Sequence, residues 1–331
     1  MSRPLSVLLF AFGTAGVNTI RALRGAGHTL TGCFTHPTTQ SWLPSVQDEC
    51  RRQNIPCSTD PSAADIAPSM AARPDVVLSV FYRRKIEMPF LKLGTIGSFN
   101  VAASQLPRYR GYFPYRWAIL NNESMWGVTV HQMTQGYGDG AVLHRRPLVI
   151  RPDDNAYELS LRVAEAATRA AVEAVERLAK GDDHLESIEA AGTKVFGPEI
   201  PFGGEIDWNQ SAARIDSFVR ALDFGRRVGD EYQHFTPPAR AVIGGRSVGI
   251  YKAKFGGTMS SYPPGTLTRC DDRIWVQTGR GHLEILEVHA QGRNYLAAEC
   301  FDADVFAPGD TFDTSHTWSS ATGPGELSHA A

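Results

Sequence analysis

The chain has 331 residues, enough for two domains, and its 42% hydrophobic and 21% charged residues are ordinary for a soluble globular protein. A formal net charge of -2 gives no broad basic surface, which argues against nucleic acid or an anionic membrane as a partner. The five cysteines form no CxxC pair, so the sequence indicates neither a metal site nor a disulfide framework, and a cytoplasmic location fits best.

Strand-like and helix-like segments alternate through the first part of the chain. The predicted strands are residues 6–12, 30–35 and 75–81, and the predicted helices are residues 17–25, 46–53 and 61–73. The first apolar run is too short to span a membrane and lacks the layout of a signal peptide. The Gly13–Gly16 turn lacks the spacing of a dinucleotide motif, so close helix packing explains it better. The alternation predicts an α/β fold with a doubly wound parallel sheet.

The segment of residues 97–143 contains more polar and turn-forming residues than packing requires. Asn100 follows a strand-like run, and a proline-rich and glycine-rich loop leads from it to a short apolar helix at residues 117–120. A strand at residues 128–130 and a glycine-rich turn at residues 136–140 come next. Polar loops at the ends of buried strands are typical of a binding or catalytic site in an α/β protein.

The second half of the chain changes character. A long helix is predicted at residues 153–180, and a helix at residues 211–222 follows a linker rich in glycine and proline. From residue 239 to residue 301 the pattern is all β. The predicted divisions are an N-terminal domain at residues 1–190, a linker with its connecting helix at 191–225, a small β-barrel at 226–307 and a mobile tail at 308–331.

The segment that begins at Asn100 contains Asn100, Ser104, Leu106-Pro107, Tyr109-Arg110-Gly111, Pro114, Trp117-Ala118-Ile119, Gly127-Val128-Thr129, Met133 and Gly140. In these residues it resembles the folate-dependent formyltransferases, which include methionyl-tRNA, glycinamide ribonucleotide and amino-sugar formyltransferases. The resemblance implies a Rossmann-like catalytic domain followed by an OB-like barrel. It also implies transfer of a one-carbon group from a folate.

The segment departs from the family at two catalytic positions. The family's histidine falls on Ala102 and its aspartate falls on Gly138, so Asn100 alone matches the catalytic trio. An amide is a suitable hydrogen-bond donor to the oxyanion of formyl transfer. His131 and Asp139 are the candidates to replace the lost groups, although a half-buried strand histidine and a turn-capping aspartate explain them equally well or better.

The resemblance also assigns a cofactor and a substrate. It implies that the loop after residue 81 binds the pterin of 10-formyltetrahydrofolate or of another folate. The expected cofactor contacts are Tyr82, Arg84, Lys85, Ile86, Tyr137 and Gly138, and the expected substrate contacts are Ser104, Arg108, Arg110 and Tyr115. Lys85 replaces an aliphatic residue of the family, and residues 83–85 alone also fit a solvated charged run. Arg110 is equally well explained by a structural role.

We therefore expect a divergent formyltransferase-family enzyme that acts on a small amine, amino sugar or amino acid in specialised biosynthesis. Its chemistry is one-carbon transfer, or an altered reaction that uses Asn100 without the usual histidine and aspartate. One alternative is a homologue that binds ligands without catalysis. Another is a conventional folate-dependent N-formyltransferase with a substituted base. The sequence leaves open a homodimer formed through the C-terminal domain.

Overall fold

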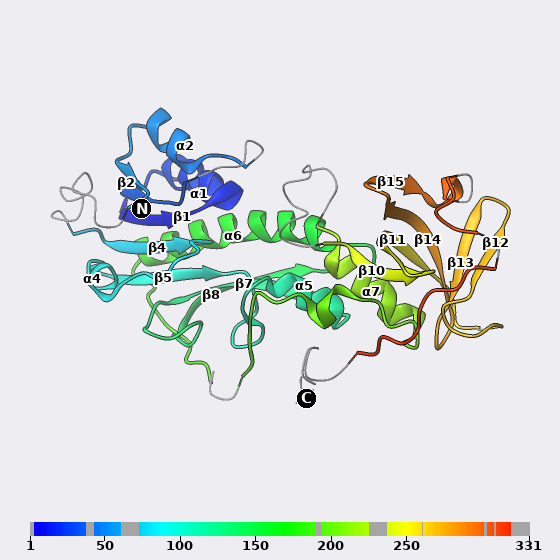
Figure 1. The fold of residues 1–331 in the computed structure, drawn as a ribbon. Coiled ribbons are helices and arrows are strands. Elements are labelled where there is room, and N and C mark those ends of the chain that lie inside the picture. Colours follow the sequence, from blue (N-terminus) through cyan, green and yellow to red (C-terminus); the bar gives the residue numbers. More distant parts are fainter. Residues whose placement is uncertain are drawn as a thin grey trace. The chain divides into compact units, whose positions relative to one another are not determined.

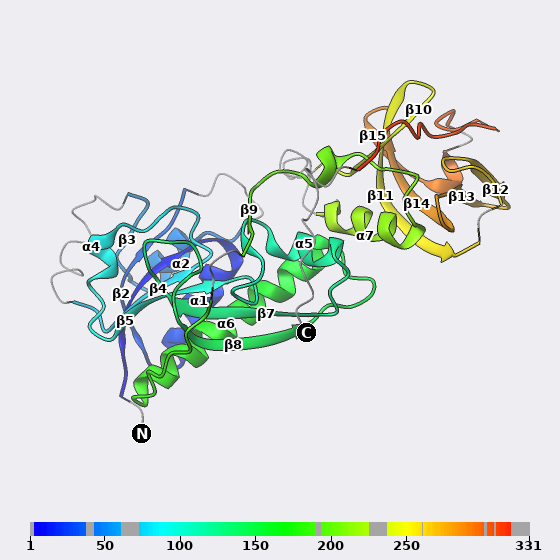
Figure 2. The ribbon, with the colours of Figure 1, turned by 90° about the horizontal axis from the view of Figure 1, so that it is seen from below.

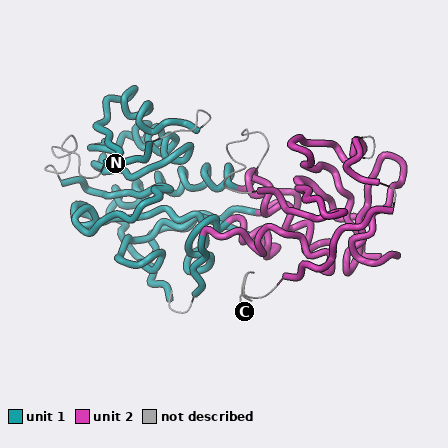
Figure 3. The backbone as a smooth tube through the Cα atoms, viewed as in Figure 1, with its two compact units in different colours: residues 1–114, 125–149, 160–197 teal, residues 115–124, 150–159, 198–331 magenta. Residues whose placement is uncertain are grey.

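The computed structural model (Figures 1 and 2) describes residues 3–37, 43–60, 73–189, 193–224, 237–259, 261–300, 303–307 and 309–318. Two compact units make up the chain, and each is described by itself (Figure 3). The first unit comprises residues 1–114, 125–149 and 160–197, and the second comprises residues 115–124, 150–159 and 198–331. The divisions expected from the sequence, at residues 190, 225 and 307, stay a prediction.

A seven-stranded sheet forms the centre of the first unit, in the order β3-β2-β1-β4-β5-β7-β8. Its strands are β1 (Ser6–Ala11), β2 (Thr29–Phe34), β3 (Cys57–Ser58), β4 (Val76–Val80), β5 (Gly97–Ala102), β7 (Met125–Gln132) and β8 (Val142–Val149). Pairs from β3 to β5 are parallel, which confirms the predicted parallel sheet, whereas β7 is antiparallel to both β5 and β8. Residues 133–141 join β7 to β8 directly, and so short a connection joins antiparallel strands.

Helices cover both faces of this sheet. They are α1 (Gly13–Gly25), α2 (Val46–Arg52), α4 (Met88–Leu91) and α6 (Ala156–Ala179), the last of which begins within the second unit. The Thr168 hydroxyl of α6 donates to the Ala15 carbonyl of α1 at 3.5 Å, so these two helices lie on one face. Phe90 of α4 packs edge-on against Phe10 of β1 on the other. Of the helices in the described residues, none combines the length and apolarity needed to cross a membrane.

The Gly13–Gly16 turn serves helix packing, as predicted. Helix α1 already begins at Gly13, whose φ of +61° favours glycine. A Cβ atom at Gly16 would lie 3.0 Å from the Ala11 Cβ and 3.0 Å from Val46 Cγ2. The glycine therefore lets α1 approach both β1 and α2 closely.

The second unit contains helix α7 and a six-stranded antiparallel sheet, which confirms the predicted all-β character of this region. Its elements are η2 (Pro201–Gly204), α7 (Ala212–Leu222), β10 (Ala239–Ile243), β11 (Arg246–Gly257), β12 (Leu267–Cys270), β13 (Arg273–Gln277), β14 (His282–Ala290), β15 (Arg293–Leu296) and η5 (Ala297–Glu299). Helix α5 (Pro114–Leu120) crosses into the same unit.

Part of the predicted mobile tail is packed in this structure. Phe312 is buried and stacks on Trp208 with ring centroids 4.7 Å apart. Trp318 stacks on Phe202 at 4.4 Å, and its indole N–H donates to the Glu205 carbonyl at 2.7 Å. These two aromatic side chains explain why residues 309–318 differ from the prediction. Residues 319–331, and all of the predicted helix 61–73 except Arg73, lie outside the described residues.

Gly111 lies where two segments of the backbone approach each other closely. It lies in β6 (Arg110–Gly111), which pairs with β9 (Val195–Phe196), and its φ is +110°. A Cβ atom there would lie 2.0 Å from the Phe196 carbonyl oxygen. We expect Gly111→Ala to lower the free energy of unfolding of the first unit by about 3 kcal/mol, because strain and a backbone clash add.

Gly181→Ala is the matched control for this prediction. Gly181 also has a positive φ, +78°, but no atom lies within 4 Å of a Cβ built on it. We expect a loss of about 1 kcal/mol from backbone strain alone. Urea unfolding of both variants measures the difference, and equal losses would contradict the proposed clash.

Candidate active site

Asn100 and His131 face each other across neighbouring strands. They are register partners in the β5–β7 pair, and the Asn100 Nδ2 atom lies 3.1 Å from His131 Nε2. The His131 Nδ1 atom lies 2.9 Å from the Gln132 carbonyl oxygen, which can only accept a hydrogen bond. Nδ1 therefore carries the proton, and Nε2 accepts the amide N–H of Asn100.

The imidazole of His131 is held neutral. Its side chain is 4% exposed, and burial lowers the pKa of His131 to about 4, against weaker opposing effects of the Gln132 carbonyl and the Asp139 charge. At neutral pH the ring is an acceptor at Nε2 and a poor proton acceptor for a substrate amine. Asn100 itself is half-buried, close to the carboxyl end of β5, where ligands bind in parallel sheets.

Asp139 does not join this pair. Its carboxylate is exposed and accepts a hydrogen bond from the Thr134 hydroxyl, which in turn accepts from the Gly136 backbone N–H at 3.1 Å. The residue closes the turn between β7 and β8 in the manner expected of a turn-capping aspartate. Two of the three predicted catalytic residues are thus brought together, and the third lies on the neighbouring turn.

Ala102 and Gly138 are the two residues at which the resemblance led us to expect a departure from the family. Ala102 is the register partner of Thr129, on the same sheet face as Asn100. Gly138 has a φ of +62°, and a Cβ atom there would lie 3.1 Å from Leu106 Cδ2 and 3.3 Å from Arg110 Cγ. A side chain at residue 138 would therefore point toward the loop that follows β5.

Four side chains form an apolar shelf, defined as Tyr82, Ile86, Leu93 and Met133, which packs against the core residues Leu8, Phe10, Phe34, Val77 and Phe90. Register pairing places Phe10, Ser79 and Asn100 on one sheet face, so the shelf and Asn100 share a face. Tyr82 stacks on His36 with ring centroids 4.3 Å apart.

The shelf combines apolar surface with an unpaired hydroxyl and nearby positive charge. The buried hydroxyl of Tyr82 has no hydrogen-bond partner among the residues that the structure describes. The exposed Arg84 and Lys85 follow it in sequence and offer positive charge at the rim. A half-buried apolar surface, an unpaired polar atom and a cationic rim fit a flat ring system with an anionic tail. Tyr137, the other expected cofactor contact, is 63% exposed on the β7–β8 turn.

The predicted substrate contacts have different environments. Ser104 is buried at 2% exposure, and its carbonyl accepts from the Thr129 hydroxyl at 2.7 Å. Arg110 donates to the Tyr137 carbonyl at 3.2 Å and to the Thr193 carbonyl at 2.8 Å, as expected of a structural arginine. Arg108 is exposed, with its guanidinium 5.4 Å from the centre of the Tyr109 ring. Tyr115 belongs to the second unit, where its ring lies 5.8 Å from that of Phe224.

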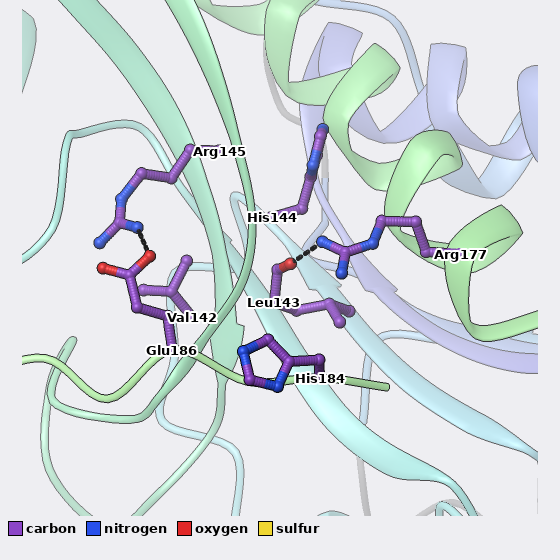
Figure 4. A pocket seen from close by; sticks show the side chains of 7 residues that line it. All are labelled: Val142, Leu143, His144, Arg145, Arg177, His184 and Glu186. Atoms are coloured by element: carbon purple, nitrogen blue, oxygen red, sulfur yellow. Dashed lines mark hydrogen bonds and ion pairs between the residues drawn. The ribbon is translucent and has the colours of Figure 1, made fainter. Parts of the chain in front are cut away.

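A cavity of about 300 Å³ that the sequence did not suggest opens at the edge strand β8 (Figure 4). It is lined by Val142, Leu143, His144, Arg145, Arg177, His184 and Glu186. Arg145 pairs with Glu186, and Arg177 bonds the Leu143 carbonyl and Asp182. Because these charges are compensated, the cavity has no free arginine with which to attract an anion. No motif in the sequence points to this cavity.

The comparisons with known proteins agree with this geometry. The family described as Formyl transferase matches residues 56–175, and its C-terminal domain matches residues 202–304. A methionyl-tRNA formyltransferase from Desulfotalea psychrophila is 28% identical over 232 residues, which are 70% of this chain and 68% of that protein. The chain belongs to the formyltransferase family.

Solved structures of sugar formyltransferases share the fold. One is WlaRD, a sugar 3N-formyltransferase in the presence of dTDP and 5-N-formyl-THF, with a TM-score of 0.66, 16% identity, and coverage of 88% of this chain and 99% of that chain. Another is an N-formyltransferase from Helicobacter canadensis in complex with folinic acid and dTDP-3-aminofucose, with a TM-score of 0.65, 18% identity, and coverage of 88% and 100%. The formyltransferase match of residues 56–175 contains Asn100, His131 and the β7–β8 turn.

The neutral state of His131 has a measurable consequence for this formyltransferase-family chain. Its pKa is about 4 when folded and about 6.5 when unfolded, so the unfolded chain binds more protons between those values. Stability that is present above pH 6.5 is therefore lost as the pH falls toward 4. We expect His131→Gln to reduce this loss by about 3 kcal/mol.

Urea unfolding at several pH values measures the slope in both proteins. Burial and the charges of Arg84 and Arg83 also lower the pKa of His36 to about 4, so the slope should become smaller without disappearing. NMR titration of the His131 imidazole gives an independent value. Identical slopes in wild type and His131→Gln, or a ring that titrates near pH 6.5, would contradict the assignment.

Proposed function

We propose that this chain is a divergent one-carbon transferase that formylates a small amine, with Asn100 as its oxyanion donor. The supporting observation is the state of the Asn100 amide. One of its N–H groups is anchored on the neutral His131, and the other has no partner among the described residues. A half-buried amide with one fixed hydrogen bond and one unused donor is oriented before a ligand arrives.

Formyl transfer to an amine passes through a tetrahedral oxyanion. Asn100 supplies one hydrogen bond at the atom where this negative charge develops, and a single donor of this kind is worth about 10²–10³ in rate. His131 orients that donor. Protonation of His131 would place an N–H opposite the amide N–H and remove the anchor, so the arrangement requires the neutral ring.

The site lacks a base matched to neutral pH. The low pKa of His131 makes it a weak base, and its Nε2 lone pair is already occupied by Asn100. The Asp139 carboxylate is bound to Thr134 on the turn. We therefore propose that the substrate enters as the free amine and loses its proton to solvent after attack.

A folate fits the shelf that Tyr82 and Ile86 form on the Asn100 face of the sheet. These two side chains would hold the ring system, with Arg84 and Lys85 near the anionic tail. A bound formylfolate supplies a formyl group on nitrogen. The net charge of -2 favours a small amine, amino sugar or amino acid over a tRNA.

The second candidate function is ligand binding without catalysis. It is favoured by Ala102 and Gly138, because neither can donate a hydrogen bond or accept a proton through its side chain. The two candidates share the folate site and differ in whether the Asn100 amide contributes to turnover.

Asn100→Ala separates these candidates. We expect the wild type to formylate at least one member of a panel of amines and amino sugars, and the variant to lose about 10²–10³ in kcat. The thermal shift caused by 5-formyltetrahydrofolate should be kept in the variant, because the shelf is unchanged. Asn18→Ala is the matched control, since Asn18 is another half-buried asparagine, in helix α1.

The outcomes of this experiment are distinct. A folate-induced shift without any formylation across the panel would support the binding protein. Formylation that survives in Asn100→Ala would remove the proposed oxyanion donor. The absence of any shift with 5-formyltetrahydrofolate would remove the folate assignment.

The pH dependence of the rate tests the missing base. We expect kcat/KM to rise with pH and to level off at the pKa of the substrate amine, since only the free amine attacks. Two amine substrates of different basicity should therefore give inflections at different pH values. An inflection at the same pH for both would reveal a general base on the protein and favour the conventional transferase with a substituted base.

A further inference from the structure

Three of the five cysteines converge in the first unit. The Sγ atoms of Cys33, Cys50 and Cys57 all lie within 4.8 Å of one another. Cys33 and Cys50 are fully buried, whereas Cys57 is half-buried and in contact with solvent. Neither the proposed formyl transfer nor the fold itself requires three thiols at one point.

Sheet register brings the group together. Cys33 of β2 and Cys57 of β3 are register partners, and the Cys33 N–H donates to the Pro56 carbonyl at 2.8 Å. Cys50 lies near the end of α2, and its carbonyl accepts from the Ile55 N–H at 2.9 Å, which turns the chain back toward β3. The spacing resembles no CxxC motif, which is why the sequence led us to expect no metal site.

The separations suit a shared metal ion. Three sulfur ligands at about 2.3 Å from one ion lie roughly 3.8–4.0 Å from each other, within the upper limit observed here. A disulfide requires an S–S distance of about 2.05 Å, and all three cysteines are free thiols in this structure. No imidazole or carboxylate of the described residues belongs to the group, so the ligand set is three soft sulfurs.

We propose that Cys33, Cys50 and Cys57 bind one thiophilic cation, zinc(II) or copper(I), through three thiolates. Soft thiolate ligands select these ions over hard cations. The solvent-exposed side of Cys57 leaves room for a water as a fourth ligand of zinc, whereas copper(I) needs only the three sulfurs.

The ion would have a structural role. It would tie β2, α2 and the two-residue strand β3 together at one edge of the sheet. In the strand order, β1 and β4 separate β2 from β5, so the site lies about 14 Å from Asn100, three strand spacings away. Its loss should therefore affect the stability of the sheet edge before it affects chemistry.

Metal titration of the reduced, chelator-stripped full chain tests the proposal. We expect cadmium(II), used as the probe for zinc, to give a thiolate charge-transfer band that saturates at one equivalent. Copper(I), titrated without oxygen against a chromophoric chelator, should also bind at one equivalent if the site accepts it. The ion with the higher affinity identifies which metal the site selects.

Cys57→Ser should weaken binding by at least about 100-fold, more than the loss of an outer-shell partner costs. Cys57 is the half-buried member, so its variant is the least disruptive to folding. Cys270→Ser is the matched control, because Cys270 is an exposed free thiol on β12 in the second unit. The absence of saturable binding, or equal affinity in Cys57→Ser, would overturn the proposal.

Alkylation of the wild type gives a second readout that needs no variant. Metal loading should protect Cys57 from iodoacetamide while Cys270 still reacts, and peptide mass spectrometry resolves the two. Equal alkylation of Cys57 with and without metal would overturn the site. So would a reduced chain that binds neither ion and reoxidises to a disulfide between Cys57 and one of its two neighbours.

Discussion

The hydrogen bond between Asn100 and His131 is the interaction on which the candidate site depends. It joins β5 to β7 across the first antiparallel pair of the sheet, and it fixes the direction of the amide. It exists only while the imidazole is neutral, and burial at 4% exposure keeps it so. The same burial that preserves the donor removes His131 as a useful base. The burial of His131 therefore accounts both for the oriented Asn100 amide and for the lack of a base at this residue.

Without a base on the protein, the substrate amine itself must be unprotonated before it attacks. An active site with a tuned base can accept a protonated amine and remove its proton, whereas we propose that this site acts on the free amine. Weakly basic amines meet that condition at neutral pH better than alkylamines do. Under the proposed function, Ala102 and Gly138 restrict the formyltransferase fold to a narrower set of amines.

Much of the fold could be predicted from local patterns. Apolar runs such as residues 6–12 and 75–81 gave buried strands, and the motif around Asn100 located the site on β5. The antiparallel direction of β7 relative to β5 could not be read from its own residues, because it depends on how residues 103–124 connect the two strands. The packing of Phe312 and Trp318 depends on Trp208 and Phe202, which are about 100 residues away in sequence, so composition alone misassigned residues 309–318.

The candidate site was less predictable than the fold. The partner of Asp139 is the hydroxyl of Thr134, a contact that depends on turn geometry and not on residue type. The cavity beside β8 and the group formed by Cys33, Cys50 and Cys57 arise from strand register between distant segments. In a sequence without aligned relatives, such contacts leave no local signal.

Arg110 links two distant segments of the backbone. Its guanidinium donates hydrogen bonds to the backbone carbonyls of Tyr137 and Thr193, which are more than fifty residues apart in sequence. Because the acceptors are main-chain oxygens, the side chains at residues 137 and 193 can be substituted without removing these hydrogen bonds. Loss of the Arg110 side chain would therefore release the β7–β8 turn and residue 193 together, so one substitution would act on two distant backbone segments.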